Sequence, residues 1–388
     1  MENFVFQNTT KIIFGKGTEK SAGAEIKKYS NKALLHYGGQ SIKKYGLYER
    51  VIKSLEEAGI EFIELSGVQP NPVLSMVKEG IELCRKNNIG FILAVGGGSV
   101  IDSAKAIAIG VPYEKDDVWD FFMGKAKAEA AVSIGVILTI TAAGSESSVV
   151  SVILNEKTQM KKGYHSSLML PKFAILNPEL TYTLPAFQTA CGSADIMSHI
   201  FERYFTQSKN TDLTDRLCEG ALKTVVENTP IVLANPENYD ARAELMWAST
   251  LAHNGLLGTG RIEDWGSHKI GHELGAVYGV THGATLSVIF PAWMKYVYKQ
   301  NIGRFKQFAF RVWGVDPCFG DDESIALEGI KKLGDFFKEI GLPTTLKELN
   351  IGDDKFEEMA LKELQWGPIG NFMELQKEDI VNILKLAM

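Results

Sequence analysis

Apolar residues in the first half of the chain form short continuous runs that alternate with segments of helical periodicity. The strand-like runs are Lys32–Tyr37, Glu61–Leu65, Phe91–Val95, Ile134–Ile140 and Phe173–Leu176. Helical patterns that extend through Ala58 and Lys86 follow the first two runs. Strands alternating with helices are typical of parallel βαβ units, and continuous apolar strands indicate a sheet covered on both faces. The pattern therefore predicts an α/β domain built on a mostly parallel sheet.

The second half of the chain loses this alternation after Leu184 and Pro185. A period of 3.6 residues dominates there, as in Asp212–Glu227, Asp240–Asn254 and Glu323–Lys338. We therefore predict two domains, an α/β domain over residues 1–180 and an all-helical domain over residues 181–388.

One window, Leu274–Met294, is long enough to cross a bilayer and contains no Asp, Glu, Lys or Arg. Gly275, Gly279 and Gly283 have the GxxxG spacing at which membrane helices pack closely. However, His282 lies near the middle of the window, and an ionisable side chain is costly in lipid. We therefore expect a buried helix–turn–helix with close backbone contacts at the glycines, and no membrane partner.

The composition is that of an ordinary globular protein, because 45% of the residues are hydrophobic and 23% are charged. This excludes collagen-like, disordered and disulfide-scaffold classes. The four cysteines form no CxxC pair, so neither a disulfide framework nor a thiolate zinc site is expected. Residues 1–11 lack the regions of a signal peptide, which predicts a cytoplasmic location. A net charge of -6 without a basic run argues against a nucleic-acid partner.

Two glycine-containing turns, Gly96–Ser99 and Ala142–Glu146, follow strand-like runs. A turn of this kind lets the phosphates of a ligand approach the backbone at the positive end of a helix. The first turn is neither a GxGxxG fingerprint nor a Walker loop, and a plain tight turn is the alternative interpretation. Two such turns at the carboxyl ends of parallel strands nevertheless predict a ligand crevice at that edge.

Four of the seven histidines lie close together in the helical half: His253, His268, His272 and His282. His268 and His272 are four residues apart and share a helix face, and Asp195 and His199 repeat this spacing on an earlier helical stretch. One carboxylate with several imidazoles suits Fe(II) or Zn(II). For any single histidine, a satisfied helix residue is the alternative. These candidate residues outnumber the four ligands that such a metal needs. The excess predicts that one histidine transfers protons or supports a ligand.

Hydrolases are poorly supported by the same residues. A zinc hydrolase of the HExxH type needs a glutamate next to its first ligand, whereas Lys269 follows His268. A GxSxG nucleophile elbow is also absent, since Ile101 follows Gly97–Val100.

Several motifs distributed over nearly the whole chain carry a family resemblance. They are FVFQNTTKIIFGKG, GGGSVIDSAK, TITAAGSES, NPELTYTLP and DWGSHKIGHELGAVYGVTHG, together with Asp195 and His199. In these motifs the chain resembles the iron-type (group III) alcohol dehydrogenases, in the branch of butanol dehydrogenases and NADPH-dependent aldehyde reductases. The resemblance implies a dehydroquinate-synthase-like fold and a homodimer or larger homo-oligomer. It further implies a divalent metal, Fe(II) or Zn(II), bound by Asp195, His199, His268 and His282, with His272 in a proton relay.

The resemblance also implies that residues 1–180 bind a dinucleotide and that residues 181–388 form the metal-binding, catalytic domain. The implied cofactor contacts are Asn71, Gly97, Gly98, Ser99, Asp102, Thr139, Thr141, Lys161 and Leu180. Lys161 is assigned by its place before Gly163, so its neighbour Lys162, or a solvated surface role for Lys161, remains an alternative.

The loop after the first strand-like run, Tyr37–Lys44, contains no acidic residue and predicts that NADP(H) is preferred over NAD(H). In NAD-selective relatives, an aspartate near the position of Gly38 binds the ribose hydroxyls. Here Gly38 leaves room, the Gln40 and Ser41 side chains can donate hydrogen bonds, and Lys43 or Lys44 can add positive charge. The alternative is that these lysines are only the solvated first turn of a helix.

The expected activity is a metal-dependent alcohol dehydrogenase or aldehyde reductase that acts on small alcohols or aldehydes such as butanol and butanal. The metal would act as a Lewis acid on the substrate oxygen, and hydride would pass to or from a nicotinamide ring. A lyase or cyclase of the same fold is the alternative, and a non-catalytic binding module is another. A cyclase for sugar phosphates would need several Lys and Arg residues, whereas Trp265, Leu274 and Tyr278 flank the metal motif.

Overall fold

The computed structural model describes residues 1–114 and 117–388, which form two compact units. The α/β unit comprises Gln7–Leu184, and the helical unit comprises Pro185–Met388 together with Met1–Phe6. The amino-terminal hexapeptide belongs to the helical unit because Glu2 N–H donates to the Gly260 carbonyl (2.9 Å) and Ser208 Oγ donates to Glu2 Oε1 (2.9 Å).

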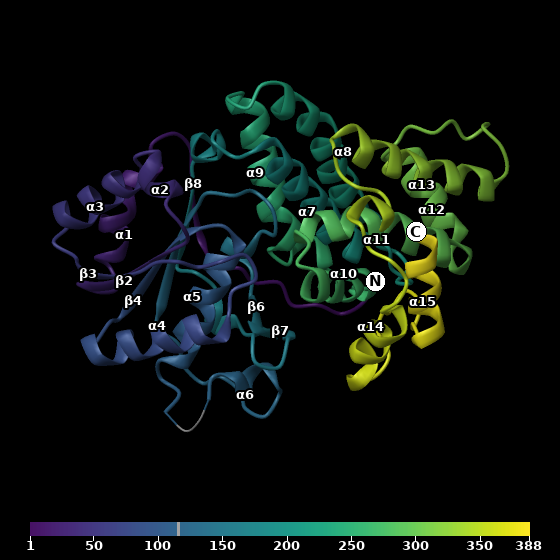
Figure 1. Ribbon diagram of the computed structural model, residues 1–388. Helices are drawn as coiled ribbons and strands as arrows, with labels where there is room; N and C mark the ends of the chain where they lie inside the picture. Colours follow the sequence, from purple (N-terminus) through teal and green to yellow (C-terminus); the bar gives the residue numbers. More distant parts are fainter. Residues whose placement is uncertain (115–116) are drawn as a thin grey trace. The chain divides into compact units, whose positions relative to one another are not determined.

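A six-stranded parallel sheet forms the centre of the α/β unit, with the strand order β1-β8-β5-β4-β2-β3 (Figure 1). The strands are β1 (Lys11–Phe14), β2 (Lys32–Tyr37), β3 (Glu61–Leu65), β4 (Phe91–Gly96), β5 (Ser133–Leu138) and β8 (Phe173–Leu176). The five runs predicted as strands are therefore all present, and the predicted mostly parallel sheet is confirmed. The strand β1 was not predicted.

Helices cover both faces of this sheet, as the continuous apolar strands require. They are α1 (Ala22–Ile26), α2 (Ser41–Lys44), α3 (Leu47–Glu57), α4 (Leu74–Asn87), α5 (Gly98–Gly110) and α6 (Trp119–Phe122). Alternate strand residues such as Leu35 and Leu93 pack with α1 and α3 on one face, and α4 and α5 lie on the other (Figure 1). On the α5 face, the buried imidazole of His36 lies between the Leu65 carbonyl and Ser103 Oγ, and burial lowers the pKa of His36 to about 4.

An antiparallel hairpin of β6 (Val150–Asn155) and β7 (Met160–His165) forms a second small sheet. It is tied to α5 by Asp102, which accepts hydrogen bonds from Val152 N–H (2.9 Å) and Ser145 Oγ (2.6 Å). The fully buried Lys105 ammonium adds bonds to Ser145 and to the Val150 carbonyl (2.8 Å). This hairpin was also missing from the predicted elements.

The helical unit contains no named strand among its described residues. Its helices are α7 (Ala186–Tyr204), α8 (Asp212–Ala234), α9 (Tyr239–His253), α10 (Gly266–Tyr278), α11 (His282–Val297), α12 (Ile302–Arg311), α13 (Asp322–Glu339), α14 (Phe356–Glu363) and α15 (Lys377–Leu386). The apolar window at 274–294 is the end of α10, a short turn and most of α11, which confirms the predicted helix–turn–helix. Within the described part of the chain, no helix is both long and apolar enough to span a membrane.

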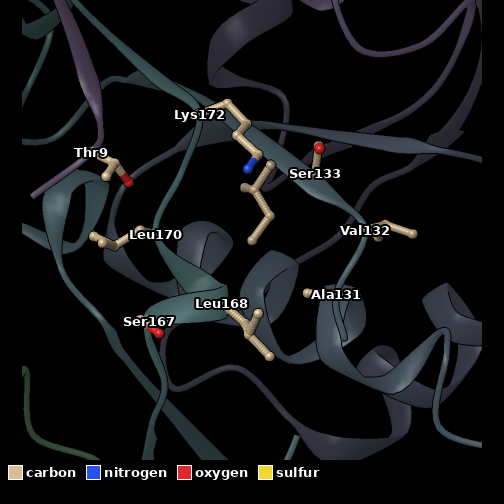
Figure 2. Close-up of a pocket in the computed structure, with 9 residues that line it drawn as sticks. Thr9, Ala131, Val132, Ser133, Ser167, Leu168, Leu170 and Lys172 are labelled. Carbon is tan, nitrogen blue, oxygen red and sulfur yellow. The ribbon is translucent and has the colours of Figure 1, made fainter. Parts of the chain in front are cut away.

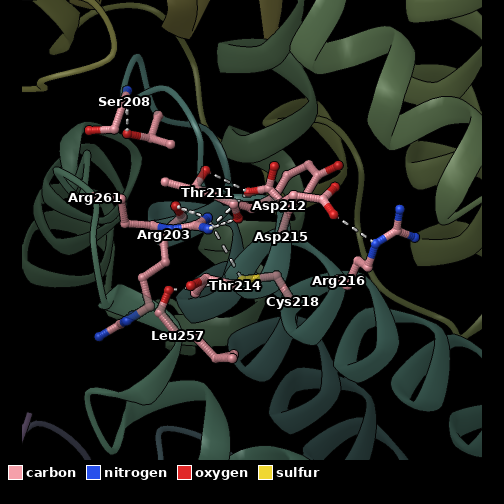
Figure 3. A network of polar contacts seen from close by, with 12 residues as sticks. Arg203, Ser208, Thr211, Asp212, Thr214, Asp215, Arg216, Cys218, Leu257 and Arg261 are labelled. Carbon is pink, nitrogen blue, oxygen red and sulfur yellow. Dashed lines mark hydrogen bonds and ion pairs between the residues drawn. The ribbon is translucent and has the colours of Figure 1, made fainter. Parts of the chain in front are cut away.

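A buried ion-pair network holds the end of α7 to the start of α8 (Figure 3). Asp215 accepts hydrogen bonds from the guanidinium groups of Arg261 (2.8 Å) and Arg304 (2.5 Å). Arg261 also donates to the carbonyls of Arg203 (3.0 Å) and Thr211 (3.3 Å). Burial of these charges is costly, so loss of either partner alone would leave an uncompensated buried charge and destabilise the region.

Candidate metal centre and cofactor site

Asp195, His268 and His282 meet in the helical unit, although α7, α10 and α11 supply one residue each. One ligand atom from each of the three lies within 4.8 Å of the others. His282 Nε2 is 3.7 Å from Asp195 Oδ1, and both Asp195 and His268 are buried. The predicted site residues of three separate helices therefore converge on one point.

Gly283 explains how α11 comes close enough to α7 for this convergence. A Cβ atom at position 283 would lie 2.1 Å from the carbonyl oxygen of Cys191, on the main chain of α7. Only a residue without a side chain permits this approach, and it brings the adjacent His282 to Asp195. The close backbone contact expected from the glycine spacing is thus present at Gly283.

His199 lies beside this group and is not part of it. Its Nδ1 is 2.9 Å from the Asp195 carbonyl and 3.0 Å from Asp195 Oδ1, which are contacts within α7 between residues four apart. Its ring centre is 4.6 Å from that of His268 and 4.5 Å from that of His253. With Nδ1 directed to the Asp195 carbonyl, Nε2 is the nitrogen that could bind a metal.

Glu202 is the residue of this site that the sequence analysis missed. Its Oε1 accepts hydrogen bonds from His268 Nδ1 (2.6 Å) and His268 N–H (3.1 Å), and its Oε2 accepts one from Trp265 N–H. Burial raises the pKa of Glu202 to about 7, and the two backbone donors oppose this shift. The bond at Nδ1 fixes the imidazole ring and leaves Nε2 as the nitrogen of His268 that could bind a metal. Asp195, His199 and Glu202 stand at i, i+4 and i+7, so helical spacing could have pointed to Glu202.

Trp265 holds the start of α10 in an unusual backbone conformation. Its φ of 69° is in the left-handed region, which a bulky residue seldom occupies. Three contacts fix it: Glu202 accepts from its N–H, Glu263 accepts from Nε1 (2.7 Å), and the Arg203 guanidinium lies over its ring at 4.9 Å. This strained turn precedes His268 by one helical turn and fixes the start of the helix that carries it.

We predict that a Glu202→Gln variant binds the metal more weakly by about 10- to 100-fold, the usual cost of losing a partner of a metal-binding histidine. The amide keeps the size of the side chain but removes the charge that orients His268. Metal titration followed by spectroscopic or calorimetric detection measures the affinity. An exposed glutamate elsewhere in the helical unit, Glu357, serves as the control as Glu357→Gln. Unchanged affinity in Glu202→Gln would contradict this role.

The donor set fits a first-row divalent metal. It offers carboxylate oxygen and imidazole nitrogen, the ligands that suit Fe(II) and Zn(II). The buried Oδ1 of Asp195 faces two imidazoles, with His199 Nδ1 at 3.0 Å and His282 Nε2 at 3.7 Å. Burial raises the pKa of Asp195, but the nearby His199, His282 and His268 outweigh it and hold the pKa below its usual range. The carboxylate is therefore kept ionised, as a metal ligand must be.

His272 lies one turn after His268 on α10 and outside the three-residue group. Its ring centre is 5.0 Å from that of His282 and 6.2 Å from that of His268. The side chain is half-buried, whereas His268 is buried. This position suits proton transfer next to the metal group better than a further ligand bond.

The predicted cofactor residues gather at the carboxyl edge of the sheet in the α/β unit. Because all six strands are parallel, the segments that follow them leave the same edge. Gly38, Gln40 and Ser41 follow β2, Asn71 follows β3, Gly97, Gly98 and Ser99 follow β4, Thr139 and Thr141 follow β5, and Leu180 follows β8. The sequence analysis expected a ligand crevice at this edge.

The turn after β4 needs glycine for a reason that the structure makes explicit. A Cβ at Gly97 would lie 3.0 Å from the Ile140 side chain, and one at Gly96 would lie 2.5 Å from Val100. Thr139 N–H donates to the Gly96 carbonyl (3.1 Å), which joins the turns after β4 and β5. In the first turn of α5, Val100 and Ile101 N–H donate to the Gly97 carbonyl, so the Gly98 and Ser99 amides are the donors suited to a phosphate.

Lys161 and Asn71 are brought together, although they are far apart in the sequence. Lys161 Nζ donates to Asn71 Oδ1 (2.9 Å), and Asn71 has a φ of 57°, a conformation that asparagine tolerates well. Asp102 is half-buried, and its two carboxylate oxygens accept the bonds from Ser145 and Val152 described above. These bonds hold the hairpin to α5, and the cofactor contact of Asp102 stays a prediction.

A small pocket lies at the opposite edge of the same sheet (Figure 2). Its volume is about 150 Å³, and it is lined by Thr9, Ala131, Val132, Ser133, Ile134, Ser167, Leu168, Leu170 and Lys172. Ser133 begins β5 and Lys172 directly precedes β8, so the pocket is at the amino ends of these strands. It is therefore separate from the predicted cofactor residues.

Comparison with protein families gives two matches that cover most of the chain. Residues 9–178 match the model described as iron-containing alcohol dehydrogenase. Residues 189–388 match the C-terminal model of the Fe-containing alcohol dehydrogenase family. The second match contains all four predicted metal ligands and His272.

Individual relatives also align with this chain over nearly its whole length. A protein of Bacillus subtilis named probable NADH-dependent butanol dehydrogenase 2 is 46% identical, with 100% of both chains covered. The NADPH-dependent aldehyde reductase YqhD of Escherichia coli is 37% identical, with 94% of this chain and 93% of the relative covered. The crystal structure of NADH-dependent butanol dehydrogenase A of Thermotoga maritima superposes with a TM-score of 0.96 at 43% identity, covering 100% and 99% of the two chains.

These matches confirm the family resemblance, the dehydroquinate-synthase-like fold class and the oxidoreductase class expected from the sequence. They give no support to the lyase or cyclase alternative. On the strength of a family model that spans residues 189–388 and of relatives aligned over the full length, the chain belongs to the iron-containing alcohol dehydrogenase family.

Proposed function

We propose that the protein oxidises small primary alcohols and reduces the corresponding aldehydes, such as butanol and butanal, with NAD(P)(H). The convergence of Asp195, His268 and His282 in the helical unit carries this proposal. Family membership implies a divalent metal and an NAD(P) cofactor, and this donor set fits such a metal. The names of the relatives point to the same chemistry in both directions, since one is a butanol dehydrogenase and another an aldehyde reductase.

Four residues of the helical unit would hold the metal: Asp195, His199, His268 and His282. Fe(II) and Zn(II) both suit this set, and metal analysis of protein purified without oxygen distinguishes them. When bound, the metal supplies Lewis-acid polarisation of the substrate oxygen. Glu202 keeps the His268 ring oriented, and Gly283 keeps His282 beside Asp195. His272 would carry the proton between the substrate oxygen and solvent.

The α/β unit would bind the dinucleotide, and the helical unit would carry out catalysis. The turn at Gly97, Gly98 and Ser99, with Thr139 and Thr141 beside it, would hold the phosphates through backbone and hydroxyl donors. The rest of the cofactor would be contacted by Asn71, Asp102, Lys161 and Leu180. Asp102 also holds the hairpin that carries Lys161. The nicotinamide ring, when bound, accepts or donates the hydride.

Purified protein tests this function directly. Oxidation of NAD(P)H that depends on an added aldehyde, that stops on metal chelation and that returns with Fe(II) or Zn(II) is the expected result. A panel of linear and branched aldehydes then defines the substrate. Full activity after verified removal of the metal would contradict the proposed site.

For the cofactor, we propose that NADPH is preferred over NADH. The space around the loop supports this preference. Among the residues that the structure describes, none comes within 4 Å of a Cβ placed on Gly39, and a Cβ on Gly38 meets Val68 O (3.4 Å) and Val100 (3.8 Å). Gln40 and Ser41 are exposed and can donate to a 2′-phosphate. Relatives of both kinds exist, since the Bacillus subtilis protein is named for NADH and the Escherichia coli protein for NADPH.

We predict that Gly38→Asp shifts the cofactor preference toward NADH by about tenfold or more, because a carboxylate there repels the 2′-phosphate. The ratio of kcat/KM for the two cofactors measures the shift. Gly38→Asn is the matched control, with similar size and no charge. A wild-type protein that clearly prefers NADH would refute the loop argument.

We also propose a cytoplasmic location and a homodimer or larger homo-oligomer. Free cysteines at positions 84, 191, 218 and 318 fit a reducing compartment. Light scattering coupled to gel filtration determines the oligomer size.

A further inference from the structure

Tyr37, Lys43, Tyr48 and Glu64 form a polar cluster beside the carboxyl end of β2. The Glu64 carboxylate accepts a hydrogen bond from the hydroxyl of Tyr37 at Oε2 (2.5 Å) and one from the hydroxyl of Tyr48 at Oε1 (2.5 Å). The Lys43 ammonium lies over the ring of Tyr48 at 4.5 Å and over the ring of Tyr37 at 5.5 Å. Three elements, β2, β3 and α3, thus fix the carboxylate, and α2 supplies the cation.

This cluster adjoins the loop that would bind the ribose end of the dinucleotide. Tyr37 is the last residue of β2 and pairs with Val95 of β4, one residue before the glycine turn. A Cβ on Gly38 would contact Val100, in the first turn of α5. In dinucleotide-binding folds, the strand next to the glycine-turn strand ends at the ribose, where charge selects between NAD and NADP. The charges of Lys43 and Glu64 therefore act close to the position that a 2′-phosphate would take.

The two charges have opposite effects on that phosphate. Lys43 belongs to α2, which begins directly after Gln40, and an ammonium there attracts a phosphate. Glu64 attracts the same ammonium and repels a phosphate. Consistent with this pairing, hydrogen bonding to Tyr37 and the charge of Glu64 raise the pKa of Lys43 against the effect of burial. The tyrosine hydroxyls prevent the carboxylate from turning away.

We propose that Glu64 is a cofactor-specificity residue, whose carboxylate, held by Tyr37 and Tyr48, offsets the charge of Lys43 and so weakens binding of the 2′-phosphate of NADPH. Glu64 lies on β3, outside the loop after β2 from which the cofactor preference was predicted. The inference rests on the proposed function and deepens it, because it names what restrains the preference for NADPH.

The test uses two fragments that report on the ribose end alone: AMP, and adenosine 2′,5′-bisphosphate, which carries the additional 2′-phosphate. Their dissociation constants are measured by calorimetry for the wild type, Glu64→Gln, Lys43→Met and the double variant. Glu64→Gln should tighten binding of the bisphosphate about threefold and leave AMP unchanged, a small effect because both charges are partly exposed. Lys43→Met should weaken the bisphosphate by a similar factor. In the double variant, Glu64→Gln should have a smaller effect than in the wild type, because only the direct repulsion between Glu64 and the phosphate then remains.

Glu61→Gln is the matched control, since Glu61 is an exposed glutamate at the other end of β3 and pairs with Lys32. It should change neither constant. If Glu64→Gln changes the dissociation constants of both fragments by the same factor, or changes neither, the specificity role is overturned. If the wild type binds neither fragment nor intact NADH or NADPH, the proposed function fails as well, so the two failures are distinguishable.

Discussion

His268→Ala and His282→Ala variants are expected to lose the bound metal and nearly all turnover while remaining folded. Each substitution removes one nitrogen from a group whose ligand atoms lie within 4.8 Å of one another. Loss of a hydrogen-bond partner of a metal-binding histidine weakens metal affinity by about 10- to 100-fold. Loss of the histidine itself should therefore weaken metal affinity by more than about 100-fold. The helical unit has an extensive hydrophobic core of its own, and of the two histidines only His268 is buried.

Metal content by mass spectrometry, aldehyde-dependent oxidation of NADPH and the far-ultraviolet circular dichroism melt together check this result. His165→Ala is the control, because His165 lies exposed on the hairpin of the α/β unit. His268 is buried against Glu202, so its variant also tests stability, whereas the half-buried His282 separates metal loss from unfolding. A folded His282→Ala protein that retains full metal content and activity would contradict the assignment of His282 as a metal ligand.

Strands and helices with strong local patterns were predicted well from the sequence, and elements that depend on distant partners were not. The bounds of β2, β3 and β8 equal the predicted ranges. The strand β1 has only four residues and pairs with β8, which is distant in the sequence. Nothing local in KIIF distinguishes such a pairing, because the partner strand supplies its hydrogen bonds.

The candidate metal site was predicted to the level of helix faces and no further. Spacing of four residues places Asp195 and His199 on one face of α7, but periodicity does not determine where a ring nitrogen points. In the structure, His199 Nδ1 turns back to the Asp195 carbonyl, and the three-residue group forms without it. Glu202 and Glu64 were missed for a related reason: each acts through a histidine or lysine that only the folded chain brings near it.

His272→Ala should behave differently from the ligand variants, keeping its metal and losing catalytic rate. His272 lies outside the metal group, with its ring centre 5.0 Å from that of His282, and it is more exposed than His268. A side chain there can pass a proton between the substrate oxygen and solvent without bonding to the metal. Positioned proton transfer contributes about 10²- to 10⁴-fold, so kcat should fall by about a hundredfold or more.

Metal content distinguishes this role from that of a ligand, and chemical rescue distinguishes it from a structural role. Added imidazole should restore part of the rate of His272→Ala, because a diffusible base can enter the space left by the side chain. The same addition should leave His268→Ala inactive, since that variant lacks metal. His253→Ala is a second comparison, because His253 also packs against His199 but bonds to Arg203 (3.0 Å) and is not assigned to proton transfer. Equal metal loss in His272→Ala and His268→Ala would show that His272 is a ligand, and the proton relay would then have to be reassigned.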